Sequence, residues 1–176
     1  VRTYVAIAGG IDVPPILGSR ATDTLGGLGP APLRAGDEVA VGAPSGVPAP
    51  HDTAHDRLRS PRDERVGLYR GPRWDWIDAA SREVLVAEAY RVAPDSDRVA
   101  LRLSGMPLTR SGALELPSEG ILWGAVQVPP RGQPLIFLAD HPVTGGYPVV
   151  AVVAEADLDR CAQLRPGEEL RFRWLD

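Results

Sequence analysis

Two glycine-rich loops carry the side chains of this sequence that are best suited to chemistry. In the first loop, Arg20 and Asp23 precede the string LGGLG, which contains Gly26, Gly27 and Gly29. Backbone amides in such a loop can approach a phosphate or a carboxylate closely, and arginine offers these anions a planar fork of donors. Arg20 and Asp23 are therefore candidate catalytic residues, and the three glycines are candidate nucleotide contacts. The alternative is that Arg20 and Asp23 form a structural ion pair that holds a turn.

The second loop closes the segment SEGILWGAVQVPPRGQPLIFLADHPVTGGYP, which spans residues 118–148. Glycines and prolines fix the backbone around two apolar runs, and polar residues stand at the ends of those runs. A small-molecule pocket needs polar groups on such rigid turns. The candidate catalytic residue here is Tyr147, and the candidate substrate-binding residues are Gln127, Gln133, Asp140, His141, Thr144, Gly145 and Gly146. The segment is equally compatible with a hydrogen-bonded turn.

We expect the pocket to lie between the loop at 20–23 and the turn at 144–147, with Gln127 and Gln133 on its wall. Glycine and proline would hold both loops in fixed conformations, so that donors are oriented before a ligand binds. The ring of Tyr147 gives an apolar face and a polar tip that suit a small ring-shaped ligand. The alternative is that both loops only brace the fold.

A cluster of histidines offers a further pattern. His51-Asp52 and His55-Asp56 form an HDxxHD string, and two imidazoles with adjacent carboxylates can hold a divalent metal. The surrounding proline, alanine and arginine residues would not fix a coordination geometry. The sequence therefore predicts a solvated loop here and no metal site. The acidic string at 95–98 likewise predicts a turn before a strand.

The composition narrows the class of protein. The chain has 176 residues, 44% of them hydrophobic and 24% charged, which is typical of globular domains. It has no lysine, which excludes a Schiff-base lysine or a P-loop lysine within it. The net charge of −4 argues against a nucleic-acid partner, and no apolar run approaches the length of a membrane span. The single cysteine, Cys161, indicates a reducing compartment, so we expect a cytoplasmic protein in which this thiol is a small buried apolar group.

The pattern of apolar residues predicts a mainly β barrel or sandwich of short strands with two brief helices. The helices are predicted over about 75–89 and 157–163. The strands are predicted where apolar residues alternate or run together, at 66–71, 99–103, 122–128, 134–140, 147–154 and 170–174.

Three segments are predicted along the chain. Residues 1–43 begin with a strand at 3–8 and continue as a glycine- and proline-rich loop that packs on the body. Residues 44–65 have many charges and almost no large apolar side chain, which predicts a mobile connection. Residues 66–176 form the barrel domain, either alone or as one domain with 1–43. Five aliphatic side chains of the first loop are expected to be buried, namely Ile11, Val13, Ile16, Leu17 and Leu25.

Long motifs spread over nearly the whole chain resemble one protein family. The motifs are AIAGGIDVPPILGSRATD, GPRWDW, SDRVALRLSG, SEGILWGAVQVPPRGQPLIFLAD, HPVTGGYP and AQLRPGEELRFR. They resemble the biotin-dependent carboxyltransferase-like family, which includes the C subunit of 5-oxoprolinase, the second subunit of allophanate hydrolase and KipA, and is related to the carboxyltransferase region of urea carboxylase. The resemblance implies a cyclophilin-like β-barrel. It also implies that the chain is the C-terminal part of a longer protein, because family members usually carry further residues before the segment that matches VRTYVAIAGG.

The resemblance implies that the chain is part of a multi-subunit enzyme. With a separate 5-oxoprolinase A subunit and a KipI-like B subunit, it would help hydrolyse 5-oxo-L-proline to L-glutamate with ATP as co-substrate. One alternative is a regulatory protein that binds and antagonises a KipI-like inhibitor of a histidine kinase. Another is a component of a biotin-dependent urea or allophanate carboxyltransferase, which would receive biotin through a partner because this chain has no lysine to carry it.

Overall fold

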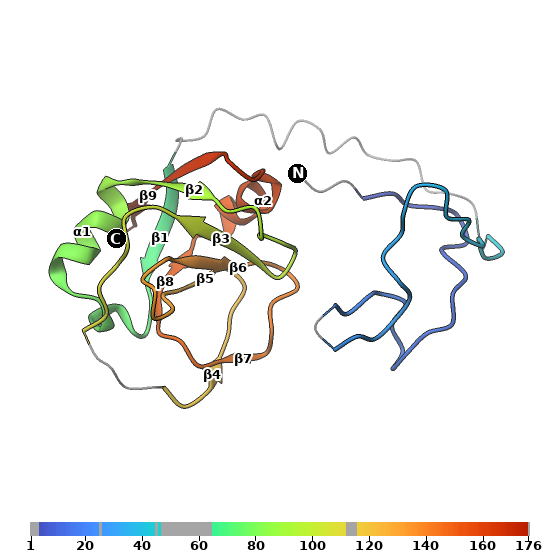
Figure 1. Cartoon of the computed structure of the whole chain (residues 1–176), viewed down its shortest axis with the longest axis horizontal. Helices are drawn as coiled ribbons and strands as arrows, with labels where there is room; N and C mark the ends of the chain where they lie inside the picture. The colour runs from blue at the N-terminus through green and yellow to red at the C-terminus, as the bar shows by residue number, and fades with distance from the viewer. Residues whose placement is uncertain (1–3, 25, 45, 47–64, 112–115, 176) are drawn as a thin grey trace. The chain divides into compact units, whose positions relative to one another are not determined.

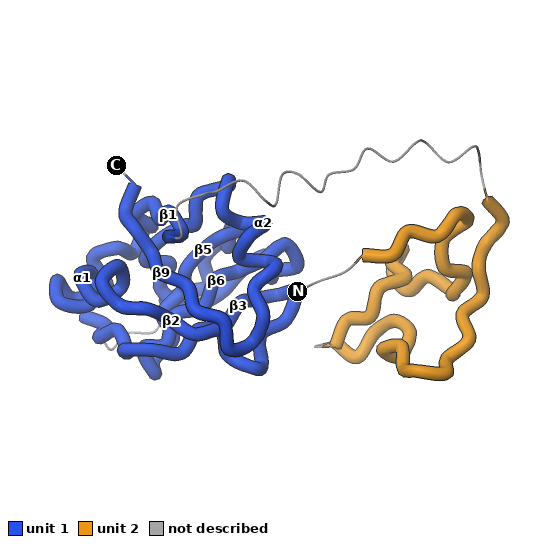
Figure 2. The backbone as a smooth tube through the Cα atoms, turned by 90° about the horizontal axis from the view of Figure 1, so that it is seen from above, with its two compact units in different colours: residues 1–2, 55–176 blue, residues 3–54 orange. Residues whose placement is uncertain are grey.

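The computed structural model describes residues 4–24, 26–44, 46, 65–111 and 116–175. The chain divides into two compact units, residues 1–2 with 55–176 and residues 3–54 (Figure 2). We refer to the first as the barrel unit and to the second as the loop unit. The predicted mobile connection at 44–65 lies almost entirely outside the described residues, and the HDxxHD string at 51–56 lies wholly outside them, so both stay predictions.

Seven short strands of the barrel unit close into a barrel (Figure 1). Their order is β1-β8-β5-β6-β3-β2-β9, and the parallel pairing of β9 with β1 closes the ring. The other neighbouring strands pair antiparallel. The predicted mainly β barrel with two helices is therefore confirmed. The bounds of the barrel strands are β1 Arg65–Arg70, β2 Ala89–Val92, β3 Ala100–Ser104, β5 Ala125–Gln127, β6 Leu135–Phe137, β8 Val149–Val153 and β9 Glu169–Trp174.

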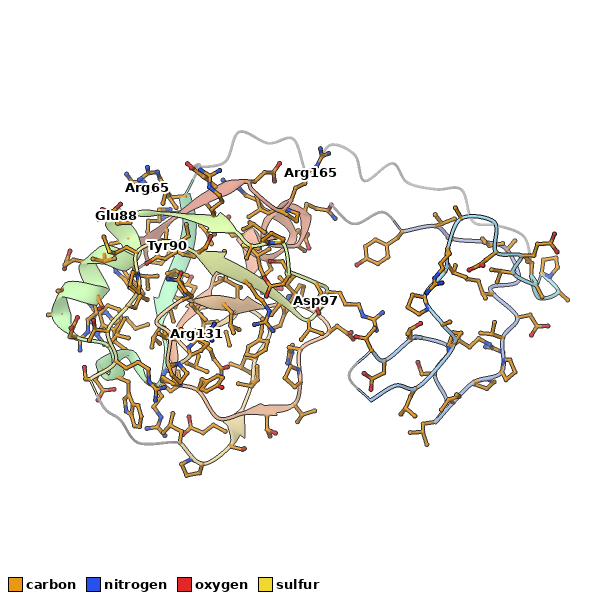
Figure 3. The ribbon with its side chains drawn as sticks, viewed as in Figure 1. Arg65, Glu88, Tyr90, Asp97, Arg131 and Arg165 are labelled. Atoms are coloured by element: carbon orange, nitrogen blue, oxygen red, sulfur yellow. The ribbon has the colours of Figure 1, made fainter. Side chains whose placement is uncertain are left out.

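A separate antiparallel ribbon pairs β4 (Glu119–Gly120) with β7 (Thr144–Gly145). It joins the loop that precedes β5 to the loop that precedes β8 (Figure 1). Between β2 and β3, Asp97 makes the predicted turn (Figure 3). Its Oδ1 accepts hydrogen bonds from the backbone amides of Val99 at 2.9 Å and Ala100 at 3.0 Å. This carboxylate therefore holds the turn at the start of a strand, as expected for an aspartate there.

The inside of the barrel is filled by apolar side chains of its strands. In β9, Leu170 and Phe172 are buried while Arg171 between them is exposed, because side chains alternate between the two faces of a strand. Tyr90 of β2 lies fully buried in the core (Figure 3). Its ring centre is 5.8 Å from that of Phe172, and its hydroxyl donates to the Met106 carbonyl at 3.2 Å. That hydrogen bond satisfies the one polar group the ring brings into the core.

Two helices and a 3-10 turn complete the barrel unit, namely η2 Trp74–Trp76, α1 Ala79–Ala87 and α2 Glu155–Gln163. The predicted helix at 75–89 is too long at both ends. Asp78 caps α1, with its Oδ1 accepting from the Ser81 amide at 2.7 Å, and the last predicted residue already belongs to β2. The second helix begins before the predicted start at 157, because Asp157 does not cap it but accepts from the Gly67 amide of β1 at 2.9 Å. In the part of the chain that the structure describes, neither helix is long and apolar enough to cross a membrane.

The loop unit is held by backbone bridges rather than by regular elements, and its described residues contain no helix or strand. The strand predicted at 3–8 is wrong over 4–8, because these residues pair with no other strand. Among the described residues of this unit, three isolated antiparallel bridges occur, Ile11–Val41, Ile16–Ser19 and Asp23–Leu28.

The aliphatic side chains of the loop unit are not buried as predicted. Ile11 is 41% exposed, Ile16 43% and Leu17 91%, while Val13 is half-buried and Leu25 lies outside the described residues. No described residue of this unit is buried. The physical reason is that the unit has no second layer of strands or helices under which these side chains could pack.

Candidate functional site

The loop unit contains an open cleft of about 770 Å³, within the size range of small-molecule sites. Its lining comes from three segments, 9–13, 20–22 and 30–40, and residues 32 and 34–36 of the third segment do not contribute to it. Backbone hydrogen bonds tie the first segment to the third: the Asp12 amide donates to Ala40 at 2.8 Å, and the Gly42 amide donates to Gly10 at 3.0 Å. The cleft is therefore held between residues that are far apart in the sequence.

Arg20 lines this cleft, as a member of the first predicted loop. Its Nε donates to the Val13 carbonyl at 2.8 Å. This is the one hydrogen bond that Arg20 makes with the described residues, so its two terminal amino groups remain available to a ligand. A guanidinium whose plane is fixed in this way can bind a carboxylate or a phosphate through two parallel hydrogen bonds.

Three carboxylates also line the cleft, those of Asp12, Asp37 and Glu38. Asp37 accepts from the Arg34 amide at 2.7 Å and so holds a turn. The side chains of Asp12 and Glu38 make no hydrogen bond or ion pair with the described residues, and their oxygens can accept from a ligand. Sequence reasoning missed these two residues, because only the pairing of the segments around Ile11 and Val41 brings them to one cleft.

Asp23 and the LGGLG string form a closed turn. The Asp23 carboxylate accepts from the Gly26 amide at 3.0 Å, and Asp23 and Leu28 exchange backbone hydrogen bonds of 2.8 and 3.1 Å. Gly29 has a φ of +85°, and a Cβ there would stand 2.2 Å from the Ala21 carbonyl oxygen. The carboxylate accepts the amide that a phosphate would need, so this geometry favours the turn over the predicted nucleotide contacts of Gly26, Gly27 and Gly29.

In the barrel unit, Gln127 braces the turn at 144–147 from inside. Its side chain is buried, and its Nε2 donates to the Tyr147 carbonyl at 2.8 Å. A Cβ on Gly145 would stand 3.1 Å from that same nitrogen, so the glycine permits the close approach. Thr144 pairs with Gly120 in the β4–β7 ribbon, and the side chain of Tyr147 is 44% exposed. Gln127, Gly145 and Tyr147 are therefore brought together, with the Tyr147 ring presented to solvent.

Three other predicted residues of the barrel unit are engaged elsewhere. Both polar groups of the Gln133 side chain bind the backbone of Gly105, at 2.9 and 3.0 Å, so Gln133 braces a different loop. Asp140 forms an exposed ion pair with Arg98, with 2.6 Å between Arg98 Nε and Asp140 Oδ2. Nδ1 of His141 lies 2.8 Å from the carbonyl of the following residue. Gln133 and Asp140 thus have structural roles in this fold.

Arg73 and Glu119 form an ion pair between η2 and the β4–β7 ribbon, a contact that sequence reasoning missed. Nε of Arg73 donates to Glu119 Oε2 at 3.2 Å, and its guanidinium lies 5.8 Å from the ring centre of Trp76. The hydrogen bond from Arg73 lowers the pKa of Glu119, and the same bond raises the pKa of Arg73. In the sequence, Arg73 belongs to the string GPRWDW, but this string does not indicate that Glu119 is the partner of Arg73.

The predicted site residues fall into both units. Arg20, Asp23 and the LGGLG glycines belong to the loop unit, and all the other candidates belong to the barrel unit. The two groups lie in different units, and the predicted pocket between the two loops stays a prediction. Among the described residues, no group of three or more His, Cys, Asp or Glu side chains is placed to hold a metal ion. The barrel-unit candidates are Gln127, Gln133, Asp140, His141, Thr144, Gly145, Gly146 and Tyr147.

Known proteins similar to this chain share both its sequence and its fold. It is 36% identical to the 5-oxoprolinase C subunit of Escherichia coli (strain K12), over 98% of this chain and 56% of that protein. It is 34% identical to the 5-oxoprolinase C subunit of Haemophilus influenzae, over 96% of this chain and 54% of that protein. The crystal structure of the Kluyveromyces lactis urea amidolyase matches 97% of this chain and 12% of that chain, with a TM-score of 0.74 and 28% identity.

These similarities extend over nearly all of the chain, which spans about half the length of the two curated 5-oxoprolinase relatives. The family described as "Carboxyltransferase domain, subdomain A and B" matches residues 1–174. The match includes the whole of the loop unit and all the strands of the barrel unit. The chain therefore belongs to the carboxyltransferase-domain family, subdomains A and B.

Proposed function

We propose that this chain is part of the C subunit of an ATP-dependent 5-oxoprolinase complex, which converts 5-oxo-L-proline to L-glutamate. The observation that carries the proposal is the 36% identity to a 5-oxoprolinase C subunit over 98% of the chain. The cleft around Arg20 supports it, because it is large enough to admit a small cyclic amide and its lining offers both donors and acceptors.

The reaction opens a five-membered lactam by adding water across its amide bond. The bond between the carbonyl carbon and the ring nitrogen breaks, the carbon gains a hydroxyl group and the nitrogen gains a proton. ATP would serve as the co-substrate of the complex, with hydrolysis to ADP and phosphate driving the opening of a stable amide. In this chain, Arg20 would bind the substrate, while Asp23 would hold the LGGLG turn beside it.

The partners in this proposal are the 5-oxoprolinase A subunit and a KipI-like B subunit. The side chain of Tyr147 is exposed, and Gln127 holds the turn that carries it by a hydrogen bond to the Tyr147 carbonyl. The Tyr147 ring would therefore be a well-positioned contact between the barrel unit and a substrate or a partner. The proposed complex would work in the cytoplasm.

A second candidate function is a carboxyltransferase component of a urea amidolyase type. The TM-score of 0.74 to the Kluyveromyces lactis urea amidolyase favours it. In this second function biotin would come from a partner, because the chain has no lysine to carry it. Residue types in the cleft suit a urea-like amide as well as a lactam.

Reconstitution separates these functions. The protein that contains this chain is combined with the purified A and B subunits, ATP and 5-oxo-L-proline, and release of glutamate is followed with each component omitted in turn. The proposal predicts glutamate only when all the components are present. Glutamate release that does not depend on this chain would contradict it, as would ATP-dependent carboxylation of urea with a biotinylated partner and no reaction of 5-oxo-L-proline.

A further inference from the structure

The lining of the loop-unit cleft combines one cation with several anions. The lining contains the guanidinium of Arg20 and the carboxylates of Asp12, Asp37 and Glu38. The formal charge of these side chains is therefore −2. A cleft of this charge repels polyanions and favours ligands that bring N–H groups to carboxylate oxygens.

The guanidinium group of Arg20 is oriented in a way that allows it to bind one carboxylate. Its Nε is held by the Val13 carbonyl at 2.8 Å, and its terminal amino groups make no hydrogen bond with the described residues. Because the guanidinium is planar, fixing Nε restricts the plane in which the two remaining groups can donate. A carboxylate can then be bound through two hydrogen bonds with little further ordering of the side chain.

The acceptors for an N–H group of a ligand come from the paired segments of the cleft. Asp12 follows the Ile11–Val41 bridge on one segment, and Glu38 lies on the segment that the Asp12 amide reaches through Ala40. Neither carboxylate has a donor among the described side chains, whereas Asp37 is engaged by the Arg34 amide. A ligand N–H would supply the missing donor.

We propose that the cleft selects a small carboxylic acid that also carries an N–H group, and that it excludes nucleotide phosphates. The carboxylate binds Arg20, and the N–H group donates to Asp12 or Glu38. This inference rests on the proposed function and narrows it, because 5-oxo-L-proline is such an acid. It also places the binding of the ATP nucleotide outside the lining of this cleft.

The turn next to the cleft supports the exclusion of ATP. The Gly26 amide already donates to the Asp23 carboxylate, which adds a further negative charge beside the glycines that would have to hold a phosphate. Phosphate-binding loops instead offer unoccupied amides, commonly with a lysine, and this chain has no lysine.

Direct binding to the purified full chain tests the inference without requiring turnover. Isothermal titration compares 5-oxo-L-proline with 2-pyrrolidinone, which lacks the carboxylate, with 5-oxotetrahydrofuran-2-carboxylate, which has a ring oxygen in place of the N–H, and with ATP. The parent acid should bind about tenfold or more tightly than either analogue, as expected when a charged hydrogen bond is lost, and ATP should show no binding that depends on Arg20.

Matched variants locate the binding. Arg20→Ala should remove the preference for the acid over 2-pyrrolidinone, and the double variant Asp12→Asn with Glu38→Gln should remove the preference for the lactam over the lactone. Arg34→Ala, an exposed arginine of the same unit outside the cleft lining, should change neither preference. Circular dichroism spectra that match the parent chain would show that the variants keep their fold.

The outcomes separate this inference from the proposed function. Binding of ATP that Arg20→Ala abolishes would overturn the inference, as would equal affinity for the acid and both analogues or no binding of the acid at all. If the complex makes glutamate while the cleft shows none of these preferences, the inference fails and the proposed function stands. If the preferences appear but the complex makes no glutamate, the ligand class stands and the proposed function fails.

Discussion

Arg20 donates from Nε to the carbonyl oxygen of Val13, at 2.8 Å, across the cleft segments of the loop unit. Among the described residues, Arg20 therefore makes its hydrogen bond through one nitrogen, and its two terminal amino groups can donate to a ligand. Since Arg20 is exposed, this hydrogen bond contributes little to the stability of the fold. The hydrogen bond instead orients the guanidinium group of Arg20. Substitutions at Arg20 should therefore lower ligand binding and activity more than they lower the melting temperature.

The LGGLG turn should tolerate a side chain at one glycine better than at another. Gly27 and Gly29 both have positive φ, but a Cβ at Gly29 meets the Ala21 carbonyl at 2.2 Å whereas a Cβ at Gly27 meets nothing within 4 Å. Both alanine variants carry the conformational cost of positive φ, about 1 kcal/mol, and Gly29→Ala adds a backbone clash. Hydrogen exchange of a peptide over residues 20–30 should therefore rise more in Gly29→Ala than in Gly27→Ala. Equal exchange in the two variants would show that the close approach is absent.

Loss of the Gln127 side-chain amide should destabilise the barrel unit. Gln127→Leu keeps a similar volume but leaves the Tyr147 carbonyl without its donor, at a cost of about 1–3 kcal/mol. The melting temperature should fall by a few degrees. Tyr147→Phe is the matched control, because it changes the ring hydroxyl and leaves the backbone carbonyl in place. A melting temperature that falls equally in both variants would contradict the bracing role of Gln127.

Asp157 should be a second buried polar contact on which stability depends. Its carboxylate accepts from the Gly67 amide at 2.9 Å and joins α2 to β1. Asp157→Ala leaves that amide without an acceptor and removes a negative charge near the start of the helix, so urea denaturation should show a loss of about 1–3 kcal/mol. The exposed Asp159 lies on the same helix and serves as the control. If Asp159→Ala costs as much as Asp157→Ala, the contact with Gly67 is not the cause.

The thiol of Cys161 should be unreactive in the folded chain. It is fully buried, and burial raises its pKa from 9.0 to about 12. The thiol therefore stays protonated between pH 7 and pH 9, and Ellman's reagent should react with it only after unfolding in guanidinium chloride. Rapid labelling of the native chain at pH 8 would contradict this.

The same shift predicts how stability depends on pH. Above about pH 9 the unfolded chain releases the thiol proton while the folded chain retains it, so folding binds more protons and the free energy of unfolding falls as pH rises toward 12. Comparison with Cys161→Ala isolates this contribution. The difference in stability between the two chains should decrease with pH over this range, and a difference that is constant or increases would be inconsistent with the raised pKa.

The barrel could be predicted from the sequence because its strands carry strong local patterns. The alternation of Leu170 and Phe172 with arginines and the continuous run around Ile136 each indicate a strand without reference to its neighbours. The end of α1 could not be placed in this way, because competition with the pairing of β2 decides it. The strand at 3–8 failed for a related reason, since a suitable composition forms no strand without a partner to pair with.

The candidate site was predictable only in part. Arg20 stood out because arginine beside a glycine-rich string is a local signal. Asp12 and Glu38 did not, because they reach the same cleft through backbone pairing between distant segments. The contacts of Gln133 could not be predicted either, because a polar residue beside a turn looks the same in sequence whether it faces a ligand or, as here, hydrogen-bonds the backbone of Gly105.

The most direct measurement is kcat/KM for 5-oxo-L-proline in the reconstituted complex, with Arg20→Ala, Arg20→Lys and Arg34→Ala compared in the protein that contains this chain. We predict that Arg20→Ala lowers kcat/KM by about tenfold or more with little change in melting temperature, and that lysine, which cannot donate as a fork, restores it only partly. Arg34→Ala should match the parent protein. Full activity of Arg20→Ala in a complex that requires this chain would contradict the assignment of the cleft as the binding site for 5-oxo-L-proline.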